Sequence, residues 1–187
     1  LFRSYEGWFQ NGLRSGRGIA YQQGLMVYQG EFESGTYQGS GVLYDKGGTR
    51  LYEGQFAGGL YDGTGKLYSA GVLSYEGQFV AGIPEGEGKR YAEKVLLYAG
   101  GFHEGLPHGE GVSYYPDGTA FYRGGFSAGI FEGDGTEYDE SGEGWTVDES
   151  WDESGVFYPN DDGGLCWHED LSENDEDSEF VRADGAG

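Results

Sequence analysis

Glycine and aromatic residues alternate with polar residues along most of this chain, with a period of two. In the segment Tyr5–Phe9 the first, third and fifth residues are Tyr, Gly and Phe, and Glu6 and Trp8 lie between them. In an extended strand these two sets point to opposite faces. A similar stretch at residues 16–21 follows a short loop at Gln10–Ser15. The pattern predicts a β-hairpin, and no segment shows the 3.6-residue period of a helix.

The hairpin pattern recurs six times, every 23 or 24 residues. Each repeat opens with Tyr-x-Gly-x-Phe, places a Gly three residues later and a Gly-x-Gly four residues after that, and closes with an aromatic residue such as Tyr21. A fixed period of this length predicts an array in which each repeat packs on its neighbours. We expect the ring side chains, closing residues included, to pack on glycine backbone as a thin core. The opening residues are expected to form a structural grid: Tyr5, Gly7, Phe9, Tyr28, Gly30, Phe32, Tyr52, Gly54, Phe56, Tyr75, Gly77, Phe79, Tyr98, Gly100, Phe102, Tyr122, Gly124 and Phe126.

The residues between the grid positions are expected to form an opposite, more polar face. Their regular spacing suits the recognition of an extended, basic ligand. A solvated face that only discourages aggregation explains the same residues, and an aromatic face that stays partly open is a further surface for a peptide. The candidate partner-facing residues are Glu6, Trp8, Glu53, Gln55, Glu76 and Gln78.

The repeat pattern degrades after Tyr138. Trp145 stands where the next opening Tyr belongs, and a turn at 152–155 leads to Val156–Tyr158. We therefore expect the six-repeat array to occupy residues 1–144, a divergent capping hairpin to occupy 145–168, and an acidic, flexible tail to occupy 169–187. The predicted fold is all-β: an elongated, twisted, single-layer antiparallel sheet of stacked hairpins, with that cap and tail at its C-terminal end.

Composition and charge narrow the classes of partner. The chain has 39 glycines and a net charge of −22, of which residues 139–187 contribute −16. Nucleic acids and anionic lipid surfaces are bound through Lys and Arg, so neither is an expected partner. No apolar stretch approaches the ~20 residues of a membrane helix, and no signal peptide is present. Because the chain begins at Leu1, we interpret it as a processed chain or a fragment; an upstream anchor and the localisation stay open.

No residue set indicates catalysis, a metal site or a cofactor. Carboxylates are too numerous for one catalytic pair to stand out, and a thin sheet offers no desolvated cleft for a catalytic acid. Cys166 and His168 are too few for zinc. A calcium-loop pattern beginning at Asp139 has Ser150 where a bidentate Glu is required. The single cysteine rules out an internal disulfide framework. We expect a protein that is not an enzyme.

The pattern Tyr-x-Gly-x-Phe-x-x-Gly-x-x-x-Gly-x-Gly-x-x-x-Tyr resembles the MORN (membrane occupation and recognition nexus) repeat, and six copies cover residues 5–138. Turns such as Tyr-Asp-Lys-Gly-Gly resemble bacterial members somewhat more than eukaryotic ones. The resemblance implies an elongated sheet of stacked hairpins. It also implies a non-catalytic scaffold or binding module. Members of the family are often joined to other domains, and some self-associate.

These observations leave three functional hypotheses. The first is a repeat scaffold that binds an extended or basic protein segment through its aromatic or polar face, or that forms a homo-oligomer through the exposed edge of its first strand. The second is a carbohydrate- or cell-wall-binding array, although such arrays use Trp cages and this one uses Tyr and Phe. The third is an accessory module of a larger enzyme or of a membrane-anchored protein.

Overall fold

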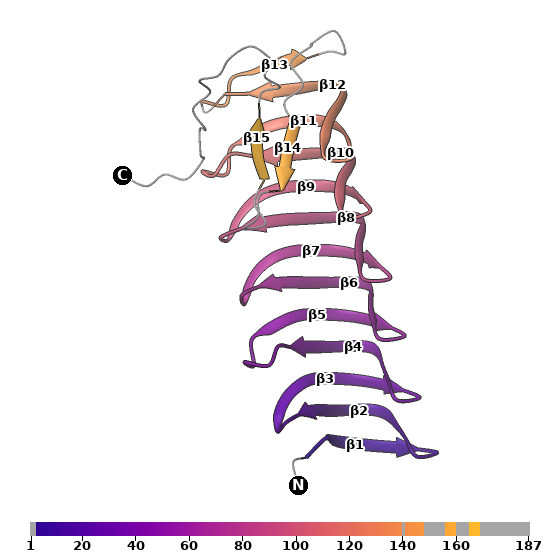
Figure 1. Ribbon diagram of the computed structural model, residues 1–187. Helices are drawn as coiled ribbons and strands as arrows, with labels where there is room; N and C mark the ends of the chain where they lie inside the picture. Colours follow the sequence, from indigo (N-terminus) through magenta and orange to yellow (C-terminus); the bar gives the residue numbers. More distant parts are fainter. Residues whose placement is uncertain (1–2, 140, 148–155, 160–164, 169–187) are drawn as a thin grey trace, which may run out of the picture. The chain divides into compact units, whose positions relative to one another are not determined.

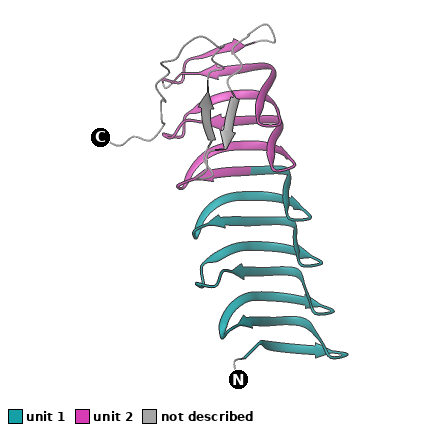
Figure 2. Cartoon of the chain, viewed as in Figure 1, with its two compact units in different colours: residues 1–88 teal, residues 89–187 magenta. Residues whose placement is uncertain are grey.

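The computed structural model describes residues 3–139, 141–147, 156–159 and 165–168, the last two ranges as backbone only. The chain divides into two compact units, residues 1–88 and residues 89–187, coloured teal and magenta in Figure 2. Every regular element in the described ranges is a β-strand, so the all-β prediction is confirmed. Within those ranges no helix is long and apolar enough to cross a membrane.

Unit 1 is a ladder of antiparallel strands that pair in the order of the sequence (Figure 1). Each hairpin of a repeat is joined to the next by a further antiparallel pairing, as expected for stacked hairpins. The strands are β1 (Tyr5–Gln10), β2 (Leu13–Gln22), β3 (Leu25–Glu33), β4 (Thr36–Tyr44), β5 (Arg50–Ala57), β6 (Leu60–Ser69) and β7 (Val72–Val80), and β8 (Ile83–Ala92) crosses the unit boundary.

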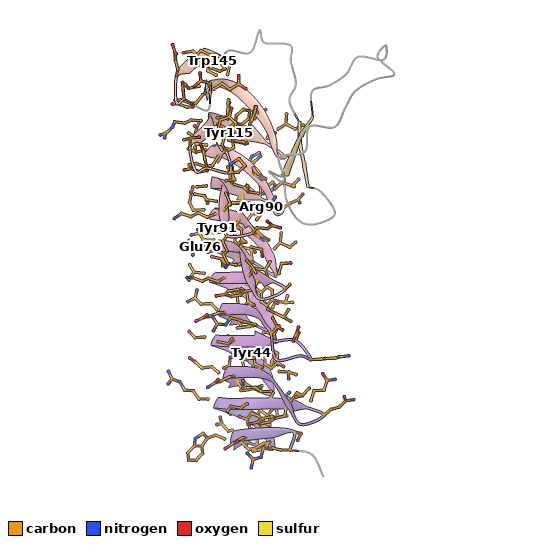
Figure 3. All side chains as sticks on the ribbon, turned by 90° about the vertical axis from the view of Figure 1, so that its left-hand side faces the viewer. Tyr44, Glu76, Arg90, Tyr91, Tyr115 and Trp145 are labelled. Carbon is orange, nitrogen blue, oxygen red and sulfur yellow. The ribbon has the colours of Figure 1, made fainter. Side chains whose placement is uncertain are left out.

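Unit 2 continues the repeat pattern with β9 (Val95–His103), β10 (Leu106–Tyr114), β11 (Ala120–Ser127) and β12 (Ile130–Tyr138). The following strand, β13 (Gly144–Val147), pairs with β12, and Trp145 lies opposite Glu137, which on its other side lies opposite the opening Tyr122. Trp145, labelled in Figure 3, thus takes the register of a seventh opening Tyr.

The expected capping hairpin between residues 145–151 and 156–158 needs correction. The strand β14 (Val156–Pro159) pairs along its length with β15 (Leu165–His168), and it contacts β12 through the single pair Ile130 and Val156. The strand β13 instead pairs with β12 and extends the repeat register there. The boundaries of the proposed cap stay a prediction, and residues 148–155 and the proposed tail lie outside the described residues.

Two-residue turns close the hairpins, which is tighter than the loop expected at Gln10–Ser15. In the first hairpin, Asn11 and Gly12 both have positive φ, 51° and 77°, as in a type I′ turn, whose twist matches that of the strands. The turn glycine also ties its hairpin to the preceding one, because the amide of Gly35 donates to the carbonyl of Arg14 at 2.9 Å.

The core of the repeats is an opening Tyr lying on two glycines. A Cβ atom added to Gly41 would lie 2.3 Å from the Tyr28 hydroxyl, and one added to Gly30 would lie 2.5 Å from it. The hydroxyl itself donates to the carbonyl of Glu31 at 3.0 Å, which satisfies the polar end of a buried ring. Glycine is therefore required at these positions, because any side chain would overlap the ring.

Rings of successive repeats interlock. The Tyr28 ring contacts Phe32 of its own repeat and Phe56 of the next at centroid distances of 5.1 and 5.2 Å, both edge-on. It also stacks on Tyr37 at 3.8 Å, a contact that the sequence analysis missed. The opening Tyr and Phe of repeats 2 to 6 are at most 3% exposed: Tyr28, Phe32, Tyr52, Phe56, Tyr75, Phe79, Tyr98, Phe102, Tyr122 and Phe126.

The closing tyrosines do not belong to this core, contrary to expectation. Ala20, one residue before Tyr21, is the register partner of the buried Tyr28, and neighbouring residues of a strand point to opposite faces. Tyr21 therefore lies on the polar face, where its hydroxyl is 3.3 Å from a carboxylate oxygen of Glu6.

Candidate partner-binding face

The polar face of unit 1 is hollowed into an open groove of about 880 Å³ that runs across β1 to β6. Its floor includes the backbone of paired grid glycines and the side chains of Ile19 and Val42, and its remaining lining is charged or polar. The lining residues on which the site depends are Glu6, Arg17, Gln29, Glu31, Glu53 and Gln55.

Three of the six candidate partner-facing residues line this groove, namely Glu6, Glu53 and Gln55. The other three, Trp8, Glu76 and Gln78, are not among its lining residues. Trp8 is 78% exposed. Glu76 forms an ion pair with Lys66, its register partner on β6, with 3.5 Å between Nζ and Oε2.

The glutamines at this face serve the backbone. Gln55 Oε1 accepts a hydrogen bond from the amide of Thr64 at 2.8 Å, and Gln78 Oε1 accepts one from the amide of Glu87 at 3.0 Å. The preceding glycine, Gly63, has φ +92° and marks a bulge, where ladder pairing is interrupted and an amide needs another acceptor. Sequence spacing alone did not reveal this role.

Two glutamates of the groove take part in matching clusters. In repeat 1, Arg3 NH1 lies 2.6 Å from Glu6 Oε2, which also accepts from the Tyr21 hydroxyl at 3.3 Å. In repeat 3, the equivalent atoms of Arg50 and Glu53 are 2.7 Å apart.

Tyr68 completes the cluster of repeat 3. Its hydroxyl lies 3.5 Å from Glu53 Oε2, and Arg50 donates to it at 3.3 Å. The Arg50 guanidinium carbon also lies 5.3 Å from the centroid of the Tyr68 ring, within cation–π range. The hydrogen bond to Tyr68, followed by the charge of Glu53, raises the pKa of Arg50.

Repeat 2 has different residues at the same positions. Met26 stands at the arginine position and Gln29 at the glutamate position, while the closing Tyr44 is retained; Figure 3 labels Tyr44 in unit 1. The remaining charged lining residues, Arg17 and Glu31, are register partners of opposite sign. The middle of the groove therefore carries no net charge from these side chains.

Among the described strands, β1 pairs with β2 alone. Phe9 is 61% exposed, whereas the equivalent Phe32 is 3% exposed. The difference arises because Phe32 is covered by the Tyr5 ring of the preceding repeat, at 5.1 Å.

Asp139, where the calcium-loop pattern begins, and two histidines of unit 2 are the next titratable residues to consider. Asp139 accepts hydrogen bonds from the amides of Ser141 and Glu143, so its carboxylate holds its own turn together. His103 and His108 are exposed and lie with their ring centroids 5.4 Å apart. In the described part of the chain, no group of three or more His, Cys, Asp or Glu residues could hold a metal ion. The side chains of Cys166 and His168 lie outside the described residues.

A comparison of the sequence with protein-family models agrees with the stacked hairpins described above. The family model of the MORN repeat matches residues 5–24, 28–50, 52–71, 75–93, 98–120 and 122–144. A search of curated proteins gave no match. The matched ranges cover all six hairpin repeats and more than half of the chain, so this protein belongs to the MORN repeat family.

Proposed function

We propose that this protein is a non-catalytic interaction module that holds an extended, basic segment of a protein partner in the polar-face groove of unit 1. The groove is the observation that carries the proposal: it is open, crosses six strands, and is lined by three carboxylates, one arginine and amide side chains above a floor that includes Ile19 and Val42. A long, shallow surface of this kind suits a chain segment better than a small molecule, which needs an enclosing pocket.

The burial of the aromatic face also favours the polar face as the binding surface. The opening Tyr and Phe rings of repeats 2 to 6 are at most 3% exposed, so this side offers a partner little ring surface. The polar face instead keeps half-buried tyrosines and carboxylates within reach of solvent. Ion pairs and aromatic contacts with arginine are the interactions that such a face makes best.

The test is a peptide-display selection on the full chain, with random twelve-residue peptides. We expect the enriched peptides to be basic and to lose binding to the variant Val42→Trp, which fills the groove floor. A Lys46→Gln variant, altered in an exposed turn away from the groove, is expected to bind them as the native chain does. Enriched peptides that bind equally well to Val42→Trp would contradict the proposal.

Self-association through β1 is a second candidate, favoured by the exposure of Phe9 and Trp8. A strand from a second copy pairing with β1 would cover both rings. Sedimentation velocity over a wide concentration range tests it: an oligomer that dissociates in the Phe9→Ser variant supports this mode. A native chain that stays monomeric excludes it.

A further inference from the structure

Building on the proposed function, we propose that Arg3 and Arg50 are internal placeholders. Each occupies a subsite built from a glutamate and a closing tyrosine, and a cationic side chain of the bound segment displaces it. The two subsites are Glu6 with Tyr21 and Glu53 with Tyr68. Their separation selects a ligand whose two cations lie six residues apart in a polyproline II conformation.

The chemistry of each subsite suits a guanidinium or an ammonium group. A carboxylate oxygen and a tyrosine hydroxyl converge on one position, which the protein's own arginine fills in repeat 3 with bonds to both groups. The Tyr68 ring adds a face on which the guanidinium rests. The ligand's cation would meet the same three groups.

The placeholders are easy to displace. The side chains of Arg3 and Glu6 are 64% and 56% exposed, and those of Arg50 and Glu53 are 45% and 47% exposed. Exposed ion pairs contribute little to stability because water and salt screen them. An arginine from a ligand that is held elsewhere in the groove can therefore replace either one.

The fold does not require these arginines. Repeat 2 has Met26 and Gln29 at the equivalent positions, yet Met26 pairs with Tyr21 in the same register in which Arg50 pairs with Tyr44. The strands, turns and ring contacts of repeat 2 follow the common pattern. A role in ligand selection explains arginines at repeats 1 and 3 better than a structural role does.

Strand spacing sets the distance between the subsites. Glu6 lies on β1 and Glu53 on β5, which are separated by four strand intervals. Intervals of about 4.8 Å place the subsites roughly 19 Å apart. A polyproline II helix rises ~3.1 Å per residue and completes a turn every three residues, so six residues span ~19 Å and return to the same side. An α-helix would need about 13 residues.

Proline rulers test the inference directly. The probes are fluorescent peptides with two arginines separated by four, five or six prolines, and binding to the full chain is measured by anisotropy at low salt. Five prolines match both the distance and the direction of the subsites, whereas four or six change the span by ~3 Å and rotate one arginine by about 120°. We expect the five-proline ruler to bind about two- to fivefold more tightly than the other two, the value of one exposed ion pair.

Variants separate displacement from general electrostatics. Arg50→Gln frees a subsite and is expected to tighten binding of the five-proline ruler about two- to fivefold. Lys46→Gln changes the net charge equally but lies outside the groove, so it is expected to have a smaller effect. Glu53→Gln and Glu6→Gln each remove a subsite and are expected to abolish the length preference.

Three results would overturn the inference: equal binding of all rulers, equal effects of Arg50→Gln and Lys46→Gln, or no ruler binding to either the native chain or Arg50→Gln. The proposed function is judged separately by the display selection. If display peptides still bind in the groove, the function stands and only the placeholder role fails. If they do not, both fall.

Discussion

The Tyr28 hydroxyl lies so close to Gly41 that a single added methyl group would stand 2.3 Å from it. Tyr28 and Gly41 come from opposite strands of one hairpin, and the ring covers the glycine pair in their register. The relationship recurs with Tyr52 on Gly65 and with Tyr122 on Gly135. In this fold, each of these tyrosine rings therefore packs directly on the backbone of a glycine pair and leaves no room for a side chain there.

The first prediction follows from that contact. Gly41→Ala is expected to lower the free energy of unfolding by roughly 1–3 kcal/mol, the usual cost of overpacking a rigid site. Ser40→Ala, an exposed change in the same strand, is expected to stay within about 0.5 kcal/mol. Urea unfolding followed by circular dichroism measures both. Equal midpoints for the two variants would show that the ring moves aside freely.

Much of this core could be predicted because the repeat fixes parity. Tyr28, Gly30 and Phe32 share one side of a strand in any hairpin, and only a glycine accepts a ring at contact distance. Two features escaped this reasoning. The closing Tyr44 lies an odd number of residues after Gly41 and so points to the opposite face, a signal that was present in the spacing. The stack of Tyr37 on Tyr28 depends on cross-strand register through a two-residue turn.

The contacts of the polar face were harder to predict. Gln55 and Gln78 accept hydrogen bonds from backbone amides at bulges, next to Gly63 and Gly86, which have positive φ. Sequence spacing does not reveal the positions of these bulges. Glu6 and Glu53 form ion pairs with arginines three residues earlier. The repeat pattern does not predict these pairs, because the other repeats lack an arginine at that position. The pairing of β14 with β15 likewise has no counterpart in the repeat pattern.

A second prediction concerns the turn between β8 and β9. Glu93 and Lys94 have φ of 49° and 76°, and the left-handed region costs a residue with a Cβ roughly 1–2 kcal/mol relative to glycine. Lys94→Gly is therefore expected to stabilise the protein by about 1 kcal/mol. Thermal unfolding checks it, with Gly24→Lys, at the matching turn position in unit 1, as the inverse. An unchanged or lower melting temperature for Lys94→Gly would contradict the argument.

Alkaline pH is expected to unfold the array through its buried tyrosines. Burial raises the pKa of Tyr52 to about 12, and it also raises the pKa of Tyr28, Tyr61 and Tyr122. Above the ordinary tyrosine pKa of about 10, the unfolded chain loses these protons first, so stability falls as pH rises from 10 towards 12. Unfolding free energies measured across this range test it. The fall should be shallower in Tyr52→Phe, and an identical slope would count against the explanation.

Acid pH is expected to loosen the turn at residues 45–49, which joins β4 to β5. Hydrogen bonds from the amides of Thr49 and Gly47 lower the pKa of Asp45. A carboxylate with a depressed pKa stabilises the fold above its unfolded pKa, near 3.8, and that contribution is lost as pH falls through the lower, folded value. Asp45→Asn is expected to reduce this acid sensitivity, and Lys46→Ala in the same turn is expected to leave it unchanged. Amide exchange at Gly47 and Thr49 measures the effect, and equal pH profiles in all three proteins would contradict it.

The central claim is that the two faces have separate tasks, the aromatic face holding the fold and the polar face binding the partner. Leu43 pairs with Tyr28 and Tyr52 on the first face, and its neighbour Val42 lines the groove on the second. The decisive measurement is the stability and the peptide affinity of Leu43→Ala and Val42→Trp, determined side by side. We predict that Leu43→Ala loses about 2 kcal/mol of stability while its folded form retains affinity, and that Val42→Trp stays folded and loses binding. If both variants lose affinity in proportion to stability, or if Val42→Trp binds normally, the division between the faces is wrong.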